Sequence, residues 1–152
     1  MTGFDQPGSL ERSVAQSEIR EILHRYAYMA RENADFEGMA PLFTPDGIFR
    51  LPNGVALKAS EIRKVVQGQE PTFIRHHLTT YNVEFVSSEE AKTVSYFFAC
   101  THKTSVDHWG CWRDTFRKSA SGPWLIAERF VQVEGSSPDG WFAEVYKGSE
   151  TA

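Results

Sequence analysis

Residues 72–87, TFIRHHLTTYNVEFVS, form the stretch of sequence that decides the fold. The segment is rich in β-branched and aromatic residues such as Ile74 and Tyr81, which is typical of a β-strand. Because side chains alternate along a strand, the adjacent His76 and His77 are predicted to point to opposite faces of a sheet. At most one of these two histidines can therefore face an interior cavity.

Three later segments have the same strand character. Residues 91–105, 109–118 and 124–134 are predicted strands, and short polar or glycine-containing turns separate them. In the first of them, alternation places one set of larger side chains on a common face: Val94, Tyr96, Phe98 and Cys100. Four long strands joined in series by short connections predict an antiparallel sheet.

The first third of the chain is predicted to be mainly helical. Residues 1–12 are polar and are expected to form a loose arm. A helix is predicted to begin near Ser13 or Ser17, where the spacing of Ser, Gln and Glu resembles N-terminal capping. Its apolar stripe consists of Ile19, Ile22, Leu23, Tyr26 and Ala30. This stripe predicts one buried helix face.

Two shorter helices and a hairpin are expected to follow. Residues 36–43 predict the second helix, which a turn at residues 45–47 ends. A hairpin is predicted around residues 52–54, and a third helix runs from Ser60 to a stop at Gly68. Helices followed by a segregated sheet predict an α+β fold.

The chain is expected to form one domain, residues 1–152, whose last part is an extension. Residues 135–152 start in a loop and contain an aromatic cluster: Trp141, Phe142 and Tyr146. This segment is too apolar for a free tail. It is therefore expected to dock over the body of the domain or against a second subunit.

The composition excludes several classes of protein. The net charge of −4, with both signs interspersed, provides no surface for nucleic acid or acidic membranes. No segment approaches the roughly 20 apolar residues of a membrane span, and the N-terminus lacks a signal-peptide pattern. A cytoplasmic location is therefore expected, with Cys100 and Cys111 as buried free thiols.

Five local patterns carry a resemblance to a known family. They are Tyr26-Ala-Tyr28, Leu42-Phe43-x-x-Asp46-Gly47, Arg75-His76, Gly110-x-Trp112-x-Asp114 and Trp124-x-x-x-x-Arg129. Together with the order of elements, they resemble the SnoaL-like branch of the NTF2-like superfamily. The fold of this superfamily includes polyketide cyclases, scytalone dehydratase, lindane dehydrochlorinase, bile acid dehydratase and ketosteroid isomerase. The resemblance implies a cone in which a curved, mixed or antiparallel sheet wraps around about three N-terminal helices.

The resemblance also implies a reaction centre. His76 occupies the place of the family's proton-abstracting histidine, but Arg31 stands where the partner aspartate is often found. A histidine base without a carboxylate loses much of its advantage, so Asp35 or Asp114 is considered as a replacement. Tyr26 is expected to act as a hydrogen-bond donor.

Arg129 has two interpretations. The resemblance implies that it binds a leaving group or an anionic substrate edge, whereas the alternative is an ion pair with Asp114 or Glu128. The predicted ligand-binding residues are Tyr28, Tyr96, Phe98, Trp112, Asp114 and Phe116. Their aromatic members are expected to form an apolar cavity that suits a ring-shaped ligand.

No cofactor is expected. The remaining histidines, His24, His102 and His108, show no spacing of two histidines and a carboxylate on one element, so no metal site is predicted. A homodimer or homotrimer is expected, because a curved sheet with exposed aromatic residues commonly finds a partner surface.

Two functions remain open at this point. The first is a cofactor-independent lyase or isomerase of the dehydratase or cyclase type, with His76 as general acid and base on a small hydrophobic, cyclic substrate. The alternative is a non-catalytic module for small-molecule binding or assembly, such as the β subunits of ring-hydroxylating dioxygenases. Arg31 in place of aspartate favours this alternative.

Overall fold

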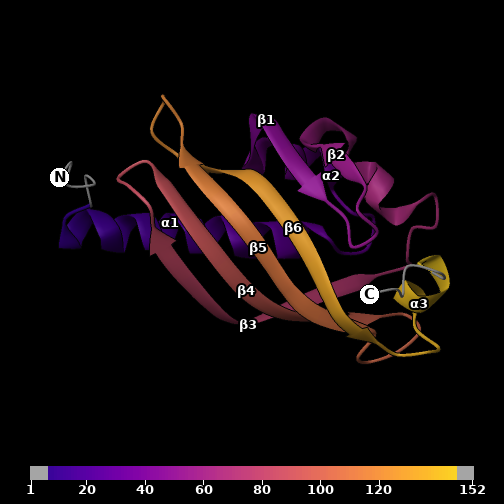
Figure 1. Cartoon of the computed structure of the whole chain (residues 1–152). Coiled ribbons are helices and arrows are strands. Elements are labelled where there is room, and N and C mark those ends of the chain that lie inside the picture. Colours follow the sequence, from indigo (N-terminus) through magenta and orange to yellow (C-terminus); the bar gives the residue numbers. More distant parts are fainter. Residues whose placement is uncertain (1–6, 147–152) are drawn as a thin grey trace.

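The structure is a computed structural model that describes residues 7–146 of the chain. In chain order (Figure 1), its elements are α1 (Ser9–Met29), α2 (Phe36–Met39), the 3₁₀ turn η1 (Ala40–Leu42), β1 (Phe43–Arg50), β2 (Ala56–Lys58), the 3₁₀ segment η2 (Ala59–Val66), β3 (Ile74–Phe85), β4 (Glu90–Thr101), β5 (His108–Lys118), β6 (Trp124–Ser136) and α3 (Trp141–Val145). The predicted α+β class is confirmed. Within the described residues, no helix is long and apolar enough to cross a membrane.

The first helix begins earlier than predicted. α1 starts at Ser9 with Gly8 as its N-cap, and the Glu11 carboxylate accepts a hydrogen bond from the Gly8 backbone N–H at 3.0 Å. The expected loose arm over residues 1–12 is therefore wrong from Ser9 onward, whereas residues 1–6 lie outside the described part. The predicted stripe does face the core. The buried residues of α1 are Ala15, Ile19, Leu23, Tyr26 and Ala27.

Six strands form one mixed, open sheet in the order β2-β1-β6-β5-β4-β3. β3, β4, β5 and β6 pair antiparallel in series, as their short connections predict, whereas β1 pairs parallel to β6. Figure 1 shows α1 lying across one face of the long, curved strands, with α3 beyond the end of β6. The helices thus cover one face of the sheet. Any interior cavity must therefore lie between the helices and this face.

The predicted turn at residues 45–47 is instead part of β1. The pairing of β1 with β6 shifts in register between Phe43 and Ile48, and this irregularity accommodates the Pro-Asp-Gly sequence within the strand. A Cβ at Gly47 would lie 2.8 Å from the Phe43 Cβ, so glycine is needed where the backbone folds closely on itself. The predicted hairpin around residues 52–54 is confirmed by the antiparallel pairing of β1 and β2.

The third N-terminal helix is a 3₁₀ segment and not an α-helix. η2 buries Ile62 and ends where Gln67 and Gly68 adopt positive φ angles of 49° and 71°. The left-handed conformation ends the segment, in agreement with the stop predicted at Gly68.

The inward and outward faces of β4 are the reverse of the prediction, which expected Tyr96 and Phe98 to face the cavity. Thr93, Ser95 and Phe97 are buried and point inward, whereas Tyr96 is 51% exposed. Phe98 is half-buried and stacks on the exposed His77 with ring centroids 4.8 Å apart, on the outer face of the sheet. Tyr96 and Phe98 therefore do not form walls of an interior cavity.

Candidate functional site

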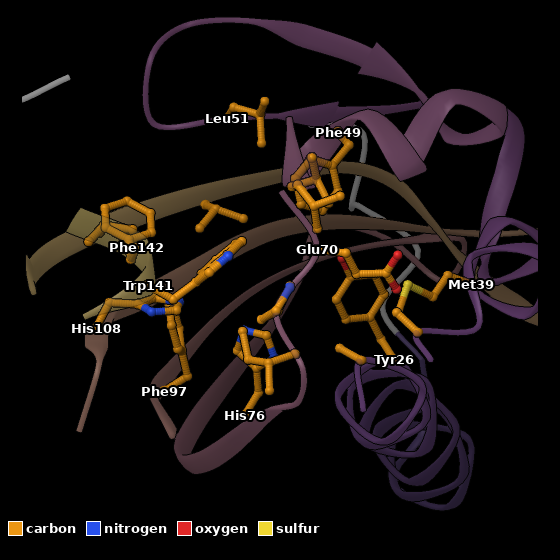
Figure 2. Close-up of a pocket in the computed structure, with 18 of the residues that line it drawn as sticks. Tyr26, Met39, Phe49, Leu51, Glu70, His76, Phe97, His108, Trp141 and Phe142 are labelled. Atoms are coloured by element: carbon orange, nitrogen blue, oxygen red, sulfur yellow. The ribbon is translucent and has the colours of Figure 1, made fainter. Parts of the chain in front are cut away.

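An interior cavity of about 90 Å³ lies between the C-terminal end of α1, the inner face of the sheet and α3 (Figure 2). Its walls are mainly aromatic and aliphatic. The lining residues with polar side-chain atoms are Tyr26, Arg31, Glu70, His76, His108, Trp112, Trp141 and Tyr146. An apolar cavity with a few convergent polar groups is the usual form of a small-molecule site.

His76 faces this cavity from β3, as the alternation argument allows. Its ring contacts Phe97, Trp112 and His108, with centroid distances of 5.6, 5.4 and 5.9 Å. The Nδ1 atom is buried and has no hydrogen-bond partner among the described residues. Burial, followed by repulsion from His108, Arg129 and His77, lowers the pKa of His76 from 6.5 to about 3. His76 is therefore neutral at pH 7.

Within residues 7–146, no carboxylate forms a hydrogen bond or an ion pair with His76, although Glu70 lines the same cavity. Asp35 is the N-cap of α2, where it accepts a hydrogen bond from the Gly38 N–H at 2.8 Å, and Asp114 pairs with Arg129. Arg31 donates to the Tyr28 hydroxyl at 2.8 Å and lies over the Tyr28 ring. Neither proposed replacement for the aspartate thus pairs with His76.

His108, and not His76, forms a hydrogen bond with a carboxylate. The Nδ1 atom of His108 lies 2.8 Å from the Asp107 Oδ1, and both residues are buried. Burial acts to raise the pKa of Asp107, but the hydrogen bonds from His108, Thr101 and the N–H groups of Phe142 and Trp141 lower it to about 2. Because an ionised carboxylate only accepts hydrogen bonds, Nδ1 of His108 carries the proton. Its Nε2 is then the basic nitrogen.

Tyr26 supplies a third polar group, from the last turns of α1. Its ring lies edge-on to Trp112 at 5.3 Å, and its hydroxyl-bearing side chain lines the cavity. Burial raises the pKa of Tyr26 to about 12, although the positive charge of Arg129 acts to lower it. The phenol is therefore a hydrogen-bond donor over the whole physiological pH range.

Arg129 lies behind the cavity wall and not in it. Its guanidinium stacks on Tyr26 at 4.3 Å and on Trp112 at 4.1 Å, and it forms two hydrogen bonds of 2.8 and 2.7 Å to Asp114. Both charged residues are fully buried. The structure thus shows the ion-pair alternative for Arg129, whose positive charge also acts on the cavity residues Tyr26 and His76.

The remaining predicted binding residues divide into one that lines the cavity and several that do not. Trp112 is a wall residue, as expected. Phe116 and Asp114 point inward but are buried away from the cavity, and Tyr28 is 68% exposed on α1. Trp112 and Phe116 share the inner face of β5, so alternation predicts their orientation but not how far the cavity extends.

The sequence analysis did not identify His108, Asp107 and Glu70 as site residues. The expected docking of the C-terminal segment over the domain is confirmed for α3, which also lines the cavity, whereas residues 147–152 lie outside the described part. A signal for His108 was present, because it lies four residues before Trp112 on the same strand and so faces the same side. Asp107 had no such signal, since it precedes the strand and pairs through its loop geometry. Within residues 7–146, no group of three or more potential ligand residues is arranged to hold a metal ion.

Comparisons with known proteins agree with this architecture. A hexachlorocyclohexane dehydrochlorinase, LinA-type3 from Novosphingobium barchaimii, superposes with a TM-score of 0.75 at 11% identity, over 86% of this chain and 93% of that chain. For a scytalone dehydratase candidate from Novosphingobium aromaticivorans, the TM-score is 0.72 at 21% identity, over 86% and 91% of the two chains. An NTF2-like protein with a cystatin-like fold from the same species superposes with a TM-score of 0.68 at 23% identity, over 86% of this chain and 89% of that chain.

These identities support a common fold and nothing more specific. No curated protein matches the sequence significantly. The model of the SnoaL-like domain family matches residues 11–130, which include α1 and most of the sheet. The chain therefore belongs to the SnoaL-like domain family and has an NTF2-like α+β fold.

Proposed function

We propose that the chain is a cofactor-independent lyase or isomerase of the dehydratase type, acting on a small and largely apolar cyclic molecule. The observation that carries this proposal is the His108–Asp107 pair, in which His108 lines the aromatic cavity next to His76. A carboxylate that holds the second nitrogen of a histidine fixes its tautomer and stabilises the imidazolium, which favours proton transfer.

His108 is the general base in this proposal. Its Nε2 takes a proton from the carbon next to a carbonyl group, and the Asp107 carboxylate stabilises the imidazolium that forms. The electron pair of the broken C–H bond forms the new double bond, and the bond to the leaving hydroxyl breaks. His108 returns its proton to the hydroxide, so one water is released and the protein regains its starting state.

His76 keeps a place in this reaction but not as the strongest base. Because its pKa is about 3, neutral His76 is a weak proton acceptor and serves as a hydrogen-bonding group. Tyr26 donates its O–H to the oxygen where negative charge develops. Arg129 supports this donation from behind the ring, since its positive charge makes the phenol more acidic than burial alone would.

A panel of cyclic β-hydroxy ketones tests the proposal, with the absorbance of the conjugated product as the readout. We expect His108→Gln to lower kcat by about 10²- to 10⁴-fold, the usual contribution of acid–base catalysis. His102→Gln is the matched control, because His102 is exposed in the neighbouring loop. Full activity in His108→Gln would contradict the proposed role.

The second candidate is a non-catalytic binding module. It is supported by the unpaired Nδ1 of His76 and by Arg31 in the family's aspartate position. Saturable binding of these ketones, measured by calorimetry, without turnover by the wild-type protein would support this candidate over the enzyme.

A further inference from the structure

Asp107 is a junction between three elements. Its Oδ1 accepts hydrogen bonds from His108 Nδ1 at 2.8 Å and the Phe142 N–H at 3.0 Å. Its Oδ2 accepts from the Thr101 hydroxyl at 2.7 Å and the Trp141 N–H at 2.6 Å. One fully buried carboxylate therefore holds β4, β5 and the start of α3 together.

α3 is itself a wall of the cavity. Trp141, Phe142 and Tyr146 line the cavity, and Phe142 stacks on the His108 ring with centroids 4.8 Å apart (Figure 2). Removing α3 would uncover one face of His108 and would also take two of the four donors from Asp107. The position of α3 and the setting of His108 are thus physically linked.

The far side of α3 is anchored to a different part of the chain. The Trp141 indole N–H donates to the Gln69 carbonyl at 2.7 Å, and the Tyr146 hydroxyl donates to the Val65 carbonyl at 2.5 Å. α3 therefore bridges the β4–β5 end of the sheet and the η2 region. It spans the two sides between which a ligand would lie.

We propose that Asp107 is a positioning residue that sets the tautomer and orientation of His108 only while α3 is docked, so that closure of the cavity and alignment of the base are one event. This inference rests on the proposed function for its chemical meaning. The coupling itself concerns structure, and it can be measured without any substrate.

The fit around Asp107 provides a test in which neither Asp107 nor His108 is substituted. Gly140 precedes α3 with an ordinary extended backbone, φ −78° and ψ 163°, which alanine adopts without strain. A Cβ at this position would lie 2.8 Å from the Asp107 Oδ2. Gly140→Ala should therefore push the start of α3 and the Asp107 carboxylate apart and loosen α3.

We expect Gly140→Ala to raise the amide hydrogen exchange of α3 roughly three- to tenfold, the factor that corresponds to about one lost hydrogen bond. In ¹⁵N NMR spectra of the imidazole nitrogens, His108 should change from a single Nδ1–H tautomer to a mixture. Faster exchange in α3 with unchanged His108 signals would overturn the inference, because the two would then be independent.

Two further variants examine the junction from the other side. Asp107→Asn keeps one carbonyl oxygen but places an NH₂ group among four donors, so His108 should switch to Nε2–H and α3 should exchange faster. Thr101→Val is the matched control, since it removes one donor to Oδ2 and leaves the His108 bond in place. An unchanged His108 tautomer in folded Asp107→Asn would also reject the proposal.

The outcomes separate this inference from the proposed function. Coupling between α3 and His108 in a protein that turns over no ketone would reject the enzymatic function and leave the coupling intact. Turnover that depends on His108, with no coupling to α3, would reject only the present inference.

Discussion

At the residue scale, His76 shows how environment can remove the chemistry that a sequence position implies. A neutral imidazole is easily buried among Phe97, Trp112 and His108, but a charged one is not, since no carboxylate in the described part of the chain accepts its proton. The same burial that places His76 in the cavity therefore weakens it as a base. His108 differs in its surroundings, because the Asp107 Oδ1 lies 2.8 Å from its Nδ1.

The lowered pKa of His76 predicts a pH dependence of stability. The unfolded state binds a proton near pH 6.5 and the folded state only near pH 3, so the unfolded state carries more protons between these values. The free energy of unfolding should therefore decrease as the pH falls through this window, by about 1 kcal/mol per pH unit between pH 6 and 5. Urea titrations at several pH values measure the effect.

The matched variants for this measurement are neighbours on β3. His76→Asn should reduce the slope, because its side chain does not titrate. His77→Asn should keep it, since His77 is exposed on the outer face. Equal slopes in the wild type and His76→Asn would show that His76 is not the responsible group.

The site could be predicted from the sequence only in part. His76, Tyr26 and Trp112 were placed correctly because strand alternation and the helix stripe determine which side chains point inward. The His108–Asp107 pair was not predicted, because adjacent residues within a strand face opposite sides. Asp107 can nevertheless face its neighbour His108, because it lies in the loop before β5 and not in the strand.

At the element scale, β5 and β6 carry a buried charge pair directly across the strand interface. Asp114 and Arg129 are paired in register and form two parallel hydrogen bonds. Arg129 also packs between the rings of Tyr26 and Trp112, so it joins α1 to the sheet. Breaking the pair leaves an uncompensated charge in the core.

We expect Asp114→Asn to lower the free energy of unfolding by about 3–5 kcal/mol, since Arg129 would lose its counter-ion in a fully buried position. Glu128→Gln is the control, because Glu128 is the neighbour of Arg129 on β6. Its ion pair with Arg50 is about half-exposed and should contribute less than about 1 kcal/mol to the free energy of unfolding. Chemical denaturation gives both values. Similar losses in the two variants would contradict the assigned role of burial.

Element boundaries were predicted less well than element types, for local reasons. The start of α1 at Ser9 depends on a contact between Gly8 and the Glu11 side chain, which resembles many other polar pairs in sequence. In β4, alternation correctly divided the side chains between two faces. The face with the larger side chains, however, is the outer one and not the inner one. Thr93 and Ser95 are small and polar but face inward, where they lie opposite Asp114 and Trp112 of β5.

At the scale of the whole molecule, the order of elements was predictable and the closure of the cavity was not. Helices followed by serial strands define the α+β cone through local patterns. α3 joins Val65, Gln69 and Asp107 across long sequence separations, and no periodicity indicates such contacts.

The outer face carries a row of rings on three neighbouring strands. His77, Phe98 and Trp109 are directly opposite one another in the register of β3, β4 and β5, and Tyr96 lies on the same face. Trp109 and Tyr96 are 39% and 51% exposed. We propose that a second copy of the chain covers this row, since exposed aromatic clusters of this kind mark interfaces.

Sedimentation analysis over a concentration series tests this assembly. We expect the wild type to form a dimer or trimer, and Trp109→Glu to shift it to the monomer, because a charge would be buried in the interface. Tyr28→Glu is the matched control, since Tyr28 is a 68% exposed aromatic residue on α1, outside the row. Circular dichroism should show that all three proteins are folded. A wild type that remains monomeric at about 100 μM, a concentration at which a specific micromolar interface would be mostly occupied, would reject the proposal.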